Sequence, residues 1–71
     1  MTINKLATGE SAQIDSIKDE LLRAQLLRFG IIEGCQIECH SKIPFGPVVL
    51  KFGGQQIALG RENAKQIKIS K

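Results

Sequence analysis

A single stretch of this 71-residue chain carries the pattern of an amphipathic helix. Leu22, Leu26 and Phe29 are spaced i, i+4, i+7, so at about 100° per residue they share one face. Asp19 is suited to cap the first turn, and the glycine after Phe29 can adopt the left-handed conformation that ends a helix. We therefore predict one helix at about 19–29, inserted in a domain that is otherwise built from strands.

The residues before this helix predict short and irregular elements. Residues 1–7 contain two branched apolar side chains, enough for an edge strand or an anchored arm. Residues 11–18 alternate between apolar and polar side chains up to Ile14, whereas Ile17 is out of phase. We therefore expect a strand that bends or ends near Ser16.

The residues after the helix predict a second strand and a loop. Ile31 and Ile32 are expected to turn inward, and residues 33–34 to form a tight turn. Residues 35–40 alternate cleanly, which indicates a strand with one buried face. Residues 41–47 contain both prolines of the chain, so they are expected to form a loop rather than a central strand.

The adjacent glycines Gly53 and Gly54 are the clearest turn signal in the chain. They separate two runs of alternating apolar residues, which is the pattern of a two-residue hairpin. A polar segment at 60–64 predicts one helical turn, and Ile67 and Ile69 predict a last strand.

These elements amount to about five short strands and one helix in a single domain at 1–71. So few short strands cannot build a two-sheet sandwich of normal size, whereas one curled sheet removes open edges and encloses a core. We predict a mostly β fold, a small SH3-like barrel with the helix across one open end. An OB-like barrel is the alternative.

The charge of the chain argues against a nucleic-acid partner. Ten Lys and Arg against seven Asp and Glu give a net charge of +3, and the positive residues are scattered without a run. Three Phe are the only aromatic residues, whereas proteins that bind single strands stack bases on exposed aromatics. We expect a solvated surface and no nucleic-acid binding.

The sequence predicts a cytoplasmic protein without direct membrane insertion. Its longest aliphatic run, 48–50, is far shorter than the roughly 20 residues that cross a bilayer, and the N-terminus lacks a signal-peptide core. Cys35 and Cys39 are four apart in an expected strand, so their Cα atoms lie about 13 Å apart, beyond disulfide reach. Free thiols fit a reducing cytoplasm.

No catalytic or cofactor-binding motif is present, so we predict no enzyme activity and no cofactor. The seven glycines match none of the phosphate-binding spacings. Cys35, Cys39 and His40 come nearest to a metal cluster, but Cys39 and His40 point to opposite faces of a strand. They cannot close a tetrahedral site within one chain. A site shared between two copies, with His40 from one and a carboxylate from the other, stays open.

The helix carries an apolar residue that its buried face does not explain. Leu27 lies roughly opposite the Leu22 side by the helical count, with Arg23 and Arg28 on its flanks. Leu27 either packs under a loop or takes part in a contact with another protein. Our hypothesis for the site is that Arg23, Leu27 and Arg28 bind a protein partner.

Five segments, taken together, carry a further signal. They are Leu26-Leu27-Arg28-Phe29-Gly30-Ile31, Gly34, Pro44-Phe45-Gly46, Ile57-Ala58-Leu59 and Arg61-Glu62-Asn63-Ala64. In this order and spacing, the chain resembles the FeoA family of small bacterial ferrous iron transport proteins over nearly its whole length. Two positions depart from the family pattern: Glu33 stands where proline is usual, and Gly60 where a basic residue is frequent.

The resemblance implies an SH3-like barrel in the cytoplasm that assists the ferrous iron permease, a membrane protein with a GTPase domain (FeoB-like). It implies docking on the permease's cytoplasmic part and an effect on its GTPase or assembly, while the oligomeric state stays open. One rival is a regulatory barrel related to the C-terminal domain of DtxR-type metal-dependent repressors, but one helix leaves no room for a helix-turn-helix. A small RNA-binding barrel is another, and it predicts steep salt dependence of binding.

Overall fold

Five antiparallel strands in a single sheet dominate the fold, which a computed structural model describes over residues 1–71. The elements are η1 (Ile3–Lys5), β1 (Ser11–Ile17), α1 (Glu20–Leu27), β2 (Gln36–Lys42), β3 (Val48–Phe52), β4 (Gln55–Leu59), α2 (Arg61–Ala64) and β5 (Ile67–Ser70). No helix among them has the length and apolar character needed to cross a bilayer.

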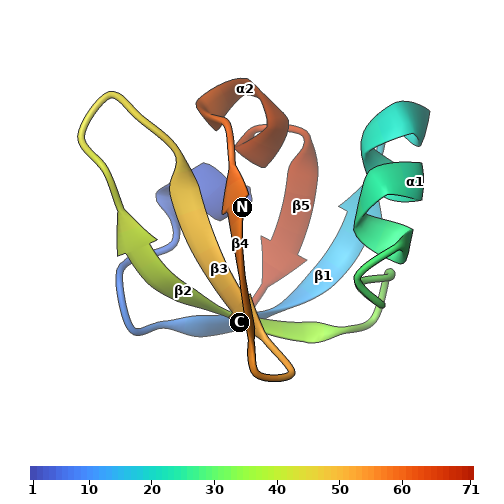
Figure 1. The fold of residues 1–71 in the computed structure, drawn as a ribbon, viewed down its shortest axis with the longest axis horizontal. Coiled ribbons are helices and arrows are strands. Elements are labelled where there is room, and N and C mark those ends of the chain that lie inside the picture. Colours follow the sequence, from blue (N-terminus) through green and yellow to red (C-terminus); the bar gives the residue numbers. More distant parts are fainter.

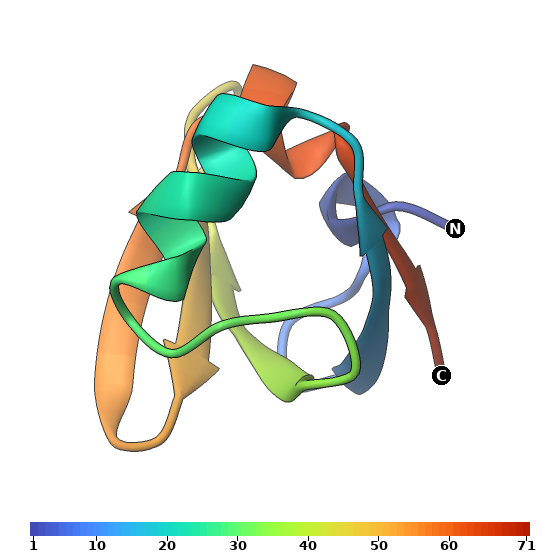
Figure 2. The same cartoon turned by 90° about the vertical axis from the view of Figure 1, so that its right-hand side faces the viewer.

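The sheet has the strand order β4-β3-β2-β1-β5 and curls around a common interior (Figure 1). Helix α1 and the segment that follows it lie across the open side of this curled sheet (Figure 2). The predicted mostly β fold, a small SH3-like barrel with one main helix, is confirmed. The core lies between the inner face of the sheet and α1.

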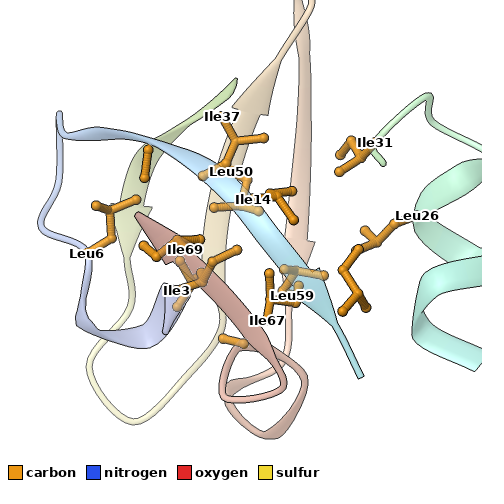
Figure 3. Packing of buried hydrophobic residues seen from close by; sticks show 14 of the residues in the cluster. Ile3, Leu6, Ile14, Leu26, Ile31, Ile37, Leu50, Leu59, Ile67 and Ile69 are labelled. Carbon is orange, nitrogen blue, oxygen red and sulfur yellow. The ribbon is translucent and has the colours of Figure 1, made fainter. Parts of the chain in front are cut away.

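Sixteen residues are buried, and all of them are hydrophobic (Figure 3). They come from every element of the chain, so the whole domain shares one core: Ile3, Leu6, Ala12, Ile14, Ile17, Leu22, Leu26, Ile31, Ile37, Cys39, Val48, Leu50, Leu59, Ala64, Ile67 and Ile69. No buried side-chain nitrogen or oxygen lacks a hydrogen-bond partner. The core is therefore a purely apolar, structural interior.

The expected irregularity near Ser16 is present in β1. Where β1 pairs with β5, the register shifts between Ile14 and Ser16. This β-bulge lets both Ile14 and Ile17 face the core although they are an odd number of residues apart.

The predicted two-residue hairpin is also confirmed. Gly53 and Gly54 both have positive φ values, +54° and +81°. Positive φ at both central residues defines a type I′ turn, whose twist matches that of the flanking strands. Phe52 pairs with Gln55 on either side of the turn, which sets the register of β3 against β4.

Helix α1 is shorter than predicted, and Phe29 lies outside it. The helix ends at Leu27, and the N–H groups of Gly30 and Ile31 donate to the carbonyls of Leu27 (3.0 Å) and Leu26 (3.1 Å). Gly30 has φ +81°, so the glycine stop is a Schellman motif, as its position predicts. Phe29 turns away from the buried face and is 44% exposed.

The first seven residues form an arm rather than an edge strand. Ile3–Lys5 are a single 3₁₀ turn, and the only bridge to the sheet joins Thr2 to Lys68. Ile3 and Leu6 are both fully buried. Their spacing of three matches the three residues per turn of a 3₁₀ helix, which explains why a strand does not form here.

Two expectations about the segment after α1 need correction. Ile31 is buried, but Ile32 is 51% exposed instead of turning inward. Neighbouring residues of an extended segment point in opposite directions, so only one of the two can face the core. Strand β2 also continues to Lys42, which shortens the predicted loop 41–47 by two residues.

Candidate protein-binding surface

Helix α1 begins with a side-chain cap that fixes its position. The Asp19 carboxylate accepts a hydrogen bond of 3.1 Å from the N–H of Leu22, one of the donors that the first turn leaves free. Leu22 and Leu26 are buried against the barrel, so Leu27 is rotated outward and is 60% exposed. Leu27 therefore does not pack under a loop.

We expect Asp19→Ala to lower the free energy of unfolding by about 1 kcal/mol, because the N–H of Leu22 loses its acceptor. Asp19→Asn keeps an oxygen acceptor at the same position and should cost less than about 0.5 kcal/mol. Urea denaturation followed by circular dichroism measures both variants. Equal losses in the two would mean that the negative charge at the helix start, and not the cap, is what stabilises α1.

Leu27 lies beside a second exposed apolar side chain, that of Ile32. Arg23, Leu27, Ile32 and Glu33 together line a shallow hollow of about 280 Å³. We call these four residues the Leu27 patch. Two large exposed apolar side chains next to a charged pair have the composition of a small contact surface between proteins.

Arg23 is held in place by two interactions at the end of β1, and its partner Glu33 is itself fixed by a third. Its Nη2 donates a hydrogen bond of 2.7 Å to the carbonyl of Ile17 and lies 3.6 Å from the Glu33 carboxylate. Glu33 in turn accepts a hydrogen bond of 3.1 Å from the N–H of Ile17. Glu33 thus fixes an arginine at the edge of the Leu27 patch.

Arg28 does not join the Leu27 patch. It lies on the other flank of α1, where a larger hollow of about 440 Å³ separates this helix from β4. We call this hollow the α1–β4 groove; its lining is Leu22, Gln25, Leu26, Arg28, Phe29, Gln56, Ile57, Ala58, Leu59 and Asn63. The structure therefore brings together Arg23 and Leu27 of the three predicted residues, and separates them from Arg28.

Two residues of the Leu27 patch, Ile32 and Glu33, are absent from the sequence-based hypothesis. A signal for Ile32 was available, since one of two adjacent isoleucines in an extended segment must point away from the core. No such signal existed for Glu33, because its partner Arg23 lies ten positions earlier and meets it only in the folded chain.

The residues nearest to a metal cluster remain apart. Cys39 is buried, His40 is exposed, and both cysteines are free thiols. No three His, Cys, Asp or Glu side chains gather in a way that holds an ion. Burial raises the pKa of the Cys39 thiol, and a hydrogen bond from Lys71 lowers the pKa of the Glu10 carboxyl. Both groups lie outside the Leu27 patch.

Comparisons with known proteins agree with this architecture. A crystal structure described as an iron uptake regulatory protein (FeoA) superposes with a TM-score of 0.85 at 21% identity, covering 97% of this chain and 93% of the other. The NMR structure of a FeoA-like protein from Clostridium acetobutylicum gives a TM-score of 0.82 at 21% identity, covering 99% and 84%. These likenesses support the fold.

A comparison with curated proteins gave no match. The sequence itself matches the FeoA domain over residues 1–71, the entire length of the chain. The chain therefore belongs to the FeoA domain family, which is associated with ferrous iron uptake.

Proposed function

We propose that this protein assists ferrous iron uptake by docking on the cytoplasmic, GTPase-bearing part of a membrane ferrous iron permease and modulating it through protein–protein contact. Membership of the FeoA domain family supports the role in iron uptake. The observation that carries the docking proposal is the Leu27 patch, where two large apolar side chains are exposed beside an immobilised arginine.

The energetics of such a contact favour this surface. Binding energy concentrates in a few residues, among which arginine is prominent, and the buried centre of an interface is more apolar than its rim. Arg23 is already held by the Ile17 carbonyl, so less side-chain entropy is lost when a partner binds it. Leu27 and Ile32 form the apolar centre of the proposed contact, and Arg28 contributes from its rim on the other flank of α1.

Leu27→Glu is expected to weaken binding to the purified cytoplasmic domain of the permease about tenfold or more, because it places a charge at the centre of an apolar contact. The matched control is Leu21→Glu, since Leu21 is on the same helix, is 70% exposed and lies about 120° from Leu27 by the helical count. The control should bind within about threefold of the original chain. Calorimetric titration measures all three affinities.

Two results would contradict the proposal. Unchanged binding of a folded Leu27→Glu variant would exclude the Leu27 patch, and absence of binding by the unaltered chain would exclude docking on the permease. In cells, deletion of the gene is expected to impair growth on ferrous iron under reducing conditions. Normal iron uptake in the deletion strain would assign the protein a different role.

A further inference from the structure

The two edge strands of the sheet, β5 and β4, differ in whether another segment covers their outer edge. The edge of β5 is covered by the N-terminal arm, where Thr2 bridges to Lys68 and the N–H of Ile69 donates to the carbonyl of Met1 (2.8 Å). The sheet ends at β4 on the other side, and no strand pairs beyond it. The outer edge of β4 is thus the uncovered one.

This edge presents free backbone groups at two residues. Hydrogen-bonded and non-hydrogen-bonded pairs alternate along an antiparallel ladder, and in a two-residue hairpin the pair next to the turn, Phe52 and Gln55, is hydrogen-bonded. Gln56 and Ala58 therefore point their N–H and C=O groups away from β3. Both residues are exposed, and neither makes a backbone hydrogen bond outside the regular elements.

The residues of β4 carry none of the usual protection of an open edge. Natural edge strands are commonly blunted by lysine, other charges or proline. The β4 sequence from Gln55 to Leu59 contains no charged residue and no proline. An uncharged edge with free donors and acceptors is a template for an additional strand.

The α1–β4 groove lies along this same edge, so an added strand would contact the residues that line the groove. Its walls are mainly apolar, with Leu22 and Leu26 from α1 facing Ile57 and Leu59 from β4. The residues that line it come from α1, from the two residues after this helix and from β4, with Asn63 from α2. A volume of about 440 Å³ is within the range of binding pockets.

One end of the groove is closed and is next to a positive charge. The Gln55 side chain donates a hydrogen bond of 3.1 Å to the carbonyl of Phe29, which joins the start of β4 to the segment after α1. Arg28 is the only charged residue among those that line the groove. A chain that pairs with β4 meets this hydrogen bond at the Gln55 end, where Arg28 favours a carboxylate.

We propose that the α1–β4 groove binds the C-terminal segment of a partner protein as a sixth strand, antiparallel to β4. Its backbone pairs with Gln56 and Ala58, its alternate apolar side chains enter the groove, and its terminal carboxylate lies beside Arg28. This mode is β-strand addition, in which backbone hydrogen bonds supply affinity and side-chain pockets supply specificity. The proposal does not depend on the permease, because the Leu27 patch lies on the other flank of α1 and only Arg28, at the rim of the proposed permease contact, is shared.

The test uses the full chain, labelled with ¹⁵N, and a mixture of synthetic hexapeptides with free C-termini. The peptides carry Val, Ile, Leu or Phe at alternate positions and Ser or Thr between them. We expect the amide signals of Gln56 and Ala58 to shift on titration up to about 1 mM peptide. The same mixture with amidated C-termini should bind about tenfold more weakly, because it loses the carboxylate near Arg28.

Ala58→Pro removes the free donor without breaking a bond to β3, since proline is tolerated on an edge whose N–H faces solvent. This variant should lose peptide binding, whereas Ala58→Ser keeps the N–H and should bind as the original chain does. If Ala58→Pro fails to fold, Arg28→Glu decides instead, because reversing an exposed charge should abolish the preference for free carboxylates.

Three results would overturn the proposal. The first is the absence of signal changes at 1 mM peptide, or changes confined to another face. The second is equal binding by the folded Ala58→Pro variant, or a preference for free carboxylates that survives Arg28→Glu. The third is a concentration-dependent shift of the Gln56 and Ala58 signals without peptide, which would assign this edge to a second copy of the chain.

Discussion

Replacing Leu26 by alanine is expected to lower the free energy of unfolding by about 2–5 kcal/mol. Leu26 is only 1% exposed and extends from α1 toward the strands, where Figure 3 shows it among the core side chains near Leu59. Alanine would leave a cavity at the point where the helix covers the open side of the barrel. A chain of this length has a total stability of about 4–10 kcal/mol, so a large share of it would be lost.

The adjacent residue supplies a matched control. Leu27→Ala removes the same atoms from the same helix, but its side chain is largely exposed, so stability should change by less than about 0.5 kcal/mol. Urea denaturation at neutral pH, followed by far-ultraviolet circular dichroism, measures both. Similar losses at the two positions would mean that α1 is not packed on the barrel as described.

The comparison between Leu26 and Leu27 also shows what periodicity can predict. The spacing of Leu22 and Leu26 identified the buried face of the helix, and it placed Leu27 away from that face. The adjacent glycines located the hairpin, because few residues other than glycine take positive φ at both central positions. The strands followed from alternation, and the bulge at Ser16 from the point where alternation fails.

The sequence left the form of the N-terminal segment open and placed Phe29 on the wrong face. The structure shows the arm: Ile3–Lys5 form a 3₁₀ turn, Ile3 and Leu6 are buried, and the residues before the turn join it to β5. Phe29 fits the helical spacing, but the turn at Gly30 rotates it out of the buried face. The glycine stop was predicted, but the spacing of apolar residues does not show that the helix ends at Leu27, before Phe29.

The candidate site was predictable only in part, for a similar reason. Arg23, Leu27 and Arg28 were chosen from one helix, where a wheel diagram gives their directions. A helical wheel does not show which residues of other elements each side chain contacts. Arg23 faces Glu33 and the end of β1, whereas Arg28 faces β4, so one predicted cluster is divided between two surfaces.

The buried thiol of Cys39 is expected to react with iodoacetamide at least about a hundredfold more slowly than Cys35. Cys39 is completely buried on β2, whereas Cys35 is partly exposed just before this strand. Only the thiolate is reactive, and burial raises the pKa of Cys39, so the reactive form is scarce as well as inaccessible. Its reaction therefore requires opening of the core. Cleavage after Glu38 separates the two cysteines, so mass spectrometry measures each rate in the same sample.

The same burial gives stability a definite pH dependence. Because the pKa of Cys39 is raised in the folded chain, the folded state keeps this proton at pH values where the unfolded state has lost it. Below the unfolded-state pKa of about 8.5, the Cys39 thiol is protonated in both states and the free energy of unfolding keeps its full value. As the pH rises toward the higher folded-state pKa, the free energy of unfolding falls by at most about 1.4 kcal/mol per pH unit. Urea midpoints should therefore decline as the pH rises above about 8.5. Cys39→Ala should flatten this decline, and Cys35→Ala should leave it in place. A decline of the urea midpoint that survives Cys39→Ala would assign the pH dependence to other groups. In the alkylation experiment, equal rates for Cys35 and Cys39 would show that β2 opens readily around Cys39.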